Sequence, residues 1–174
     1  IGANVSLCHA AAAVTGGSEV GGLIGLLQDS TAKSCYALGS VSGSNDTVGG
    51  LIGAIDGICE VSRCFARGMV AGARYVGGLI GGDWSLAGAI TVTACYATAL
   101  VSGTSSVGGL AGFSSGTIES CFWDIQTSGQ SISAGGIGKT TTQMKAQTTY
   151  TDAGWDFTSA DGDLADWWMP VDNY

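Results

Sequence analysis

Six cysteines carry the most conspicuous chemistry of this chain. Five of them recur at steps of 27, 29, 31 and 26 residues, and these are Cys8, Cys35, Cys64, Cys95 and Cys121. Zinc sites use closely spaced cysteine pairs, each with a partner pair, and Cys59 and Cys64 have no such partner. Side chains stacked in register point the same way, which orients them poorly for disulfides. We therefore expect a ladder of buried free thiols, with disulfides between neighbouring repeats as the alternative.

Two other patterns that suggest chemistry fail on inspection. The single histidine, His9, follows Cys8 where Tyr36, Phe65 and Tyr96 follow later cysteines, so it belongs to the repeat and not to a catalytic triad. The segment 135–140 resembles a phosphate-binding loop, but Ser133 stands where that motif requires glycine. We predict no catalytic residue, no cofactor and no enzymatic activity.

Carboxylates offer two further candidates. Asp161, Asp163 and Asp166 form an acidic cluster, but Ala165 stands at the fifth position, where a calcium loop of the EF-hand type needs an oxygen ligand. We expect a solvated acidic loop here, with an irregular calcium site as the alternative. Paired carboxylates could also cleave glycosides. However, the loosely corresponding corner residues Asp29, Asp56 and Asp83 are explained more simply by roles in turns.

Composition excludes several classes of protein. Glycine accounts for 30 of 174 residues and proline for one, which excludes collagen. Hydrophobic residues make up 45% and charged residues 11%, which argues against disorder. The net charge is −8 with only six basic residues, so nucleic-acid binding is not expected. No apolar run is long enough to span a bilayer, and we predict no transmembrane segment.

An internal repeat must position the cysteines. The block Val-Gly-Gly-Leu-Ile-Gly begins at Val20, Val48 and Val76, and a variant begins at Val107. A cysteine, an aromatic residue and usually alanine follow each block, and then a short β-prone stretch that ends in glycine. Repeats of this length stack as coils, because one coil alone cannot bury its apolar side.

These patterns predict an all-β fold, a parallel β-solenoid of about four to five coils with roughly three short strands per coil. We place the repeats at residues 1–123 and a C-terminal capping segment at 124–174. In this segment we expect a loop over 125–138 and a short helix within 140–150. Its aromatic residues would cover the last coil or, as the alternative, stack on a sugar; they are Trp155, Phe157, Trp167, Trp168 and Tyr174.

The repeats resemble the GLUG-motif family, through Gly-Gly-Leu-Ile-Gly, the following Cys-Tyr-Ala and the Val-Ser-Gly stretch. The segment from Cys121 to Phe157 resembles the end of such arrays. This resemblance implies a bacterial surface or secreted protein, because the family includes adhesins and some immunoglobulin A-specific metallopeptidases. With one histidine, this chain cannot contain the His-Glu-x-x-His helix of those peptidases.

We therefore expect a non-enzymatic structural or adhesive module, extracellular or at the cell surface. The sequence starts inside a repeat, which suggests either a piece of a larger protein or a subunit that stacks end to end in a head-to-tail filament. A carbohydrate-binding or carbohydrate-cleaving solenoid is the main alternative. An ice-binding solenoid is less favoured, because it would need a regular threonine array that the repeats lack.

Overall fold

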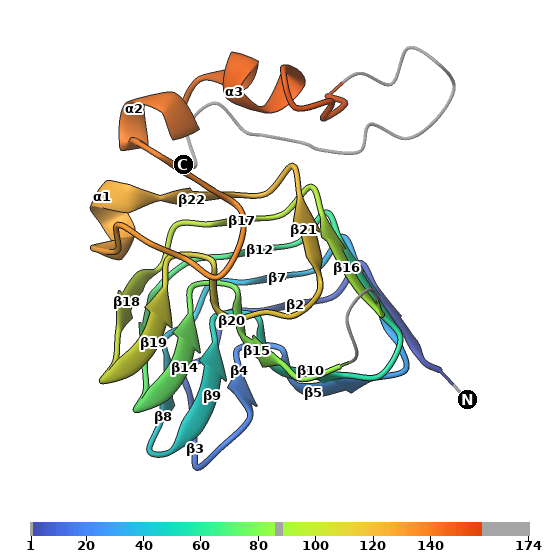
Figure 1. The fold of residues 1–174 in the computed structure, drawn as a ribbon, viewed down its shortest axis with the longest axis vertical. Coiled ribbons are helices and arrows are strands. Elements are labelled where there is room, and N and C mark those ends of the chain that lie inside the picture. The colour runs from blue at the N-terminus through green and yellow to red at the C-terminus, as the bar shows by residue number, and fades with distance from the viewer. Residues whose placement is uncertain (1, 86–88, 158–174) are drawn as a thin grey trace.

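The computed structural model describes residues 2–85 and 89–157 and shows a parallel β-solenoid (Figure 1). The chain winds through five short strands in each turn, and each strand pairs in parallel with its counterparts in the neighbouring coils. Four complete coils stack, and β21 (Thr117–Glu119) and β22 (Phe122–Asp124) begin a fifth. The predicted fold class is thus confirmed, with five short strands per coil where about three were expected.

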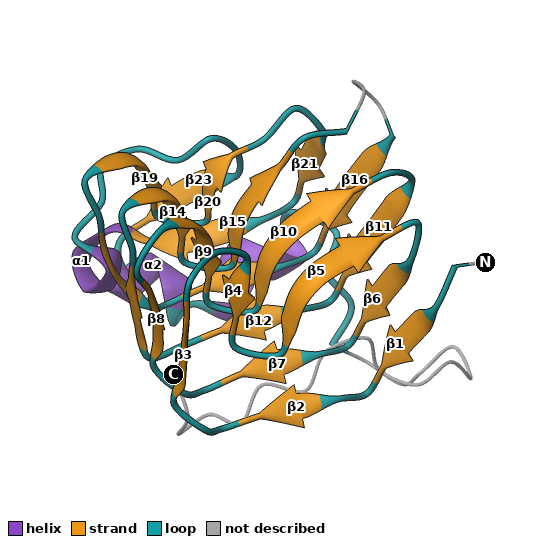
Figure 2. Cartoon of the chain, turned by 90° about the horizontal axis from the view of Figure 1, so that it is seen from below, coloured by secondary structure: helices purple, strands orange, loops and turns teal. Residues whose placement is uncertain are grey.

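The strands form five sheets, which we name A to E in chain order (Figure 2). Sheet A contains β1 (Asn4–Ser6), β6 (Thr31–Lys33), β11 (Cys59–Ser62), β16 (Ile90–Thr93) and β21 (Thr117–Glu119). Sheet B contains β2 (His9–Ala10), β7 (Tyr36–Ala37), β12 (Phe65–Ala66), β17 (Tyr96–Ala97), β22 (Phe122–Asp124) and β23 (Ile137–Lys139). Sheet C contains β3 (Val14–Gly16), β8 (Val41–Gly43), β13 (Met69–Ala71) and β18 (Leu100–Ser102).

The remaining two sheets hold the glycine blocks. Sheet D contains β4 (Val20–Gly21), β9 (Asp46–Gly49), β14 (Arg74–Gly77) and β19 (Ser105–Gly108). Sheet E contains β5 (Ile24–Gln28), β10 (Ile52–Asp56), β15 (Ile80–Asp83) and β20 (Ala111–Phe113). In these sheets Val76 pairs with Val48 and Val107, and Ile52 pairs with Ile24 and Ile80. Like residues therefore lie over like residues, as the repeat predicts.

Left-handed backbone explains why the coil has more strands than expected. Ser34, Arg63 and Ala94 each precede a cysteine and have φ of 50–54°. This conformation ends the strand of sheet A and turns the chain into sheet B, so one apolar stretch becomes two strands. Because non-glycine residues rarely adopt it, the sequence carries no sign of this corner.

The core is a narrow column between the sheets. It contains apolar residues that recur once per coil, among them Leu51, Leu79 and Leu110. A second cluster of valines and an alanine lies between sheets C and D. The glycine pairs let neighbouring backbones approach, since a Cβ added at Gly50 would lie 2.1 Å from the carbonyl oxygen of Gly78. Close approach, as predicted, is the reason for these glycines.

The segment after β22 covers the last coil (Figure 1). It contains α1 (Ile125–Ser128), β23, α2 (Thr141–Met144) and α3 (Gln147–Thr151). The expected loop over 125–138 is wrong in two places, because Asp124 caps α1 and because Ile137 pairs with Phe122 to add β23 to sheet B. The expected helix is present but divided into α2 and α3, and Thr140 caps α2 together with Gln143.

Candidate functional site

The cysteine ladder lies inside the solenoid at the junction of sheets A and B. Cys35, Cys64, Cys95 and Cys121 are buried and free, as predicted, and Cys59 is buried opposite Ile90. The thiol of Cys95 lies 3.1 Å from the carbonyl oxygen of Thr93, and the backbone N–H of Cys64 donates to its sulfur at 3.3 Å. Each thiol thus packs as a small apolar side chain would, and its hydrogen bonds also connect two coils.

Burial makes the thiols of Cys95 and Cys59 poor nucleophiles, whereas hydrogen bonds with Cys35 and Cys95 lower the pKa of Cys64 to about 4. Burial raises the pKa of Cys95 well above its ordinary value, and hydrogen bonds with Cys121 and Cys64 raise it further. Burial also raises the pKa of the Cys59 thiol. Because the thiolate is the reactive form, the thiols of Cys95 and Cys59 stay protonated at neutral pH. Among residues 2–85 and 89–157, no three histidine, cysteine or acidic side chains are grouped so that they could hold a metal ion.

An aromatic ladder follows the cysteines on sheet B. His9 stacks on Tyr36, Tyr36 on Phe65 and Phe65 on Tyr96, with ring centroids 4.8–4.9 Å apart and interplanar angles of 5–9°. The structure therefore confirms that His9 occupies an aromatic position of the repeat. Towards the last coil the cap covers the ladder, where Tyr150 and Trp155 pack on Tyr96 and Phe122. The predicted aromatic cap is confirmed for Trp155 and Phe157.

The predicted turn roles of the corner carboxylates are visible. Asp29 accepts a hydrogen bond from the backbone of Ile58, and Asp56 accepts one from the backbone of Gly57. Asp83 is buried and accepts hydrogen bonds from Ser114 and Ser115. The three residues are not in one register, because Asp56 pairs with Gln28 whereas Asp83 pairs with Ile55. They therefore form no repeated row of carboxylates.

The structure describes one of the two candidate binding motifs in the capping segment, and the other lies outside the described residues. The sequence that resembles a phosphate-binding loop contributes Ile137, Gly138 and Lys139 to strand β23. Its backbone is therefore extended at these residues and is not wrapped into an anion-binding loop. The acidic cluster of Asp161, Asp163 and Asp166 lies outside the described residues, as do Trp167, Trp168 and Tyr174.

Sequence reasoning missed an aromatic cluster at the junction of sheets D and E, formed by Tyr75, Trp84 and Phe113. The Trp84 ring lies 5.4 Å from Tyr75 and 6.1 Å from Phe113 between centroids. Trp84 is 47% exposed and Phe113 is 38% exposed. The register between coils could have revealed this cluster, because Gly82 pairs with Phe113 and the end of β20 therefore lies beside Trp84.

Comparisons with known proteins support the fold and a bacterial relationship. No family model matches the chain. The chain is 39% identical over 133 residues to a protein of Evansella cellulosilytica with the provisional name Gly-rich membrane protein. The match covers 74% of this chain but only 12% of that protein. Within the described residues, no helix is long and apolar enough to cross a membrane.

A solved structure has the same architecture. It belongs to a Bacteroides ovatus protein with the provisional name immunoglobulin A1 protease, and the TM-score is 0.66. The superposition covers 91% of this chain and 56% of the other, at 20% sequence identity. At this identity the likeness shows the solenoid fold.

Proposed function

We propose that this chain is a non-enzymatic structural or adhesive module of a larger extracellular or cell-surface protein. The observation that carries the proposal is the unbroken stack, in which each coil is hydrogen-bonded to the next through five parallel sheets. The similarity to a much longer protein named as a membrane protein supports a location at the cell surface. The repeat sequence, through its Gly-Gly-Leu-Ile-Gly blocks, further supports membership of the GLUG-motif family.

The stack suits a mechanical role. Coils held by parallel ladders and by in-register cores deform together, so the module would act as a stiff spacer. Side chains on the outer surface also connect neighbouring coils. Arg74 of one coil forms an ion pair with Asp46 of the preceding coil, and Gln28 donates a hydrogen bond to Asp56 of the next. Such a spacer would hold a binding surface at a fixed distance from its anchor.

The covered last coil favours a module within a longer chain over a head-to-tail filament. The filament needs both end coils open for pairing. Here β23 pairs with β22, and Trp155 donates from its indole N–H to the carbonyl oxygen of Ser120 at 2.9 Å. A second copy would have to displace this cover before it could stack on the last coil.

The location can be tested on intact cells of the organism that encodes the chain. We expect antibodies raised against the solenoid to label intact cells or the culture medium, and added protease to remove the label. A cytosolic enzyme that becomes accessible only after lysis is the control. Label that appears together with the cytosolic enzyme would overturn the proposal.

A further inference from the structure

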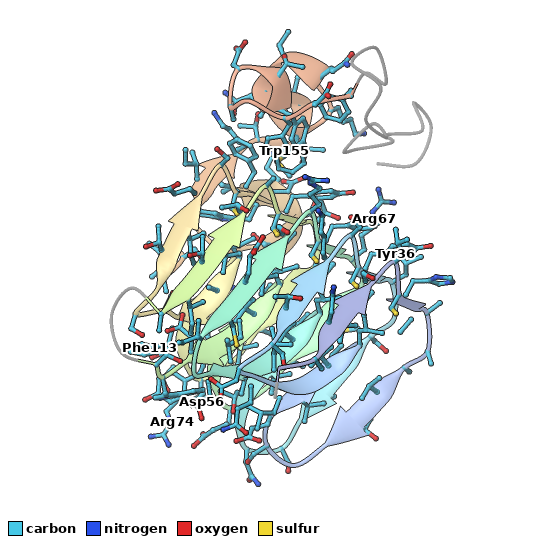
Figure 3. The ribbon with its side chains drawn as sticks, turned by 90° about the vertical axis from the view of Figure 1, so that its right-hand side faces the viewer. Tyr36, Asp56, Arg67, Arg74, Phe113 and Trp155 are labelled. Carbon is cyan, nitrogen blue, oxygen red and sulfur yellow. The ribbon has the colours of Figure 1, made fainter. Side chains whose placement is uncertain are left out.

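We propose that Tyr75, Trp84 and Phe113 form a platform that binds neutral carbohydrate chains. The proposal goes beyond the structural role and does not depend on it. In Figure 3, Phe113, Asp56 and Arg74 lie towards the lower end of the view, remote from Trp155 and the cap. Trp84 is 47% exposed and Phe113 is 38% exposed, and exposed aromatic side chains that gather on a protein surface mark a binding surface.

Neighbouring groups hold the rings in place. The buried carboxylate of Asp83, next to Trp84, accepts hydrogen bonds from the hydroxyl and the backbone N–H of Ser115, two residues after Phe113. The Trp84 ring lies against Gly82, where an added Cβ would be 2.7 Å from the indole. Arg74 lies 5.1 Å from the centre of the Tyr75 ring and is paired with Asp46. The platform is therefore formed before any ligand arrives, which lowers the cost of binding.

Polar groups on the neighbouring coil point to a sugar as the ligand. Trp84 follows Asp83, whose register partner is Ile55, so the backbone of Trp84 lies next to that of Asp56 in the neighbouring coil. The backbone N–H of Trp84 also donates to the carbonyl oxygen of Ile55 at 3.3 Å. Asp56 in turn accepts a hydrogen bond from Gln28. Sugar rings combine an apolar face, which packs on an aromatic ring, with hydroxyls that need carboxylate and amide partners.

The charges beside the rings and the position of the rings on the coils narrow the class of ligand. Arg74, which lies beside the Tyr75 ring, is paired with Asp46, so its charge is offset, and Asp56 of the neighbouring coil adds a carboxylate. Anionic sugars and nucleic acids would therefore be repelled. Tyr75 and Trp84 belong to the third coil and Phe113 to the fourth, and the three ring centroids lie 5.4–6.1 Å apart, so the cluster spans two neighbouring coils. A cluster of this extent suits contact with a short stretch of a sugar chain.

Titration calorimetry with neutral hexasaccharides tests the proposal directly. The probes are cellohexaose, laminarihexaose, xylohexaose and chitohexaose, with hexagalacturonate as the anionic comparison. We expect at least one neutral probe to bind and hexagalacturonate not to bind. Because the ligand carries no charge, added salt should leave the affinity unchanged.

Three variants locate the binding. Trp84→Ala should weaken binding about tenfold or more, because aromatic anchors carry most of the energy of a contact. Trp84→Phe should restore part of the loss. Leu100→Ala on sheet C, at a side chain that is 49% exposed, should change nothing. Far-UV circular dichroism verifies that each variant is folded. Failure of every neutral probe to bind, or equal affinity of Trp84→Ala and the unmodified chain, would overturn the proposal.

Discussion

The glycine pairs determine how closely the turns of each coil can approach, and Gly77 shows this at the scale of one residue. A Cβ at Gly77 would lie 1.9 Å from the carbonyl oxygen of Ile80 and 2.7 Å from the backbone nitrogen of Gly112. Both neighbours are backbone atoms, so no side chain can rotate away. A methyl group there must push the chain apart in two coils at once.

We therefore expect Gly77→Ala to lower the free energy of unfolding by about 3 kcal/mol. The matched control is Gly17→Ala, because the nearest atom to its Cβ would be the side-chain nitrogen of Asn45 at 3.6 Å. The control should change stability by no more than about 0.5 kcal/mol. Urea titration measures both, and equal losses in the two variants would contradict this account of the glycine block.

The cysteines give a second prediction at the residue scale. Cys8 is exposed, whereas the other five cysteines are buried. A maleimide should therefore add once to the native protein at neutral pH, at Cys8, and six times after unfolding in guanidinium. Mass spectrometry of the intact chain and its peptides counts the additions. A mass lower by two hydrogens, or rapid native labelling of Cys64, would exclude the buried free-thiol ladder.

At the scale of elements, Asp124 joins the last strand to the cap. Its carboxylate accepts hydrogen bonds from the backbone of Gln126 and Thr127 and from the hydroxyl of Thr141 in α2. Burial alone would raise the pKa of Asp124, but these hydrogen bonds outweigh it and hold the pKa below its ordinary value. A carboxyl with a depressed pKa stabilises the fold above its unfolded pKa, and this contribution is lost as the pH falls through the folded value.

Asp124→Asn should therefore lower the free energy of unfolding by about 1 kcal/mol at pH 7, because an amide nitrogen cannot accept a hydrogen bond from Thr141. The difference in the free energy of unfolding between this variant and the unmodified chain should become smaller as the pH falls below about 4. Asp152→Asn, at an exposed residue after α3, is the control for the exchange of a carboxylate for an amide. Thermal unfolding at several pH values measures the effect, and a gap that stays constant down to pH 2 would refute it.

The strands and their register also show how much of the fold could be predicted from the sequence. The recurring Val-Gly-Gly-Leu-Ile-Gly blocks predict the register of Val48 over Val76 correctly, because identical residues must occupy identical places in a stack. They could not predict five strands per coil, since the corner before each cysteine depends on ordinary residues such as Arg63 in a left-handed conformation. The sequence also gave no sign of β23, because Ile137–Lys139 is extended only through its pairing with β22.

At the scale of the whole molecule, the stack combines a repeated interior with a varied surface. The interior is predictable because every coil repeats it. The aromatic platform is not, because Tyr75, Trp84 and Phe113 share no repeated motif and come together only through the coil register. A function that depends on such a surface must be found from the folded chain, even where the fold itself can be predicted.

The central claim is that each repeat forms one coil and that equivalent side chains lie over each other. Nuclear Overhauser spectroscopy of protein with labelled aromatic residues tests it most directly, because Tyr36, Phe65 and Tyr96 are about 30 residues apart in sequence but stack at 4.8–4.9 Å. We predict ring-to-ring cross-peaks between Tyr36 and Phe65 and between Phe65 and Tyr96. Their absence in the folded protein would contradict the stacked solenoid and, with it, the proposed role.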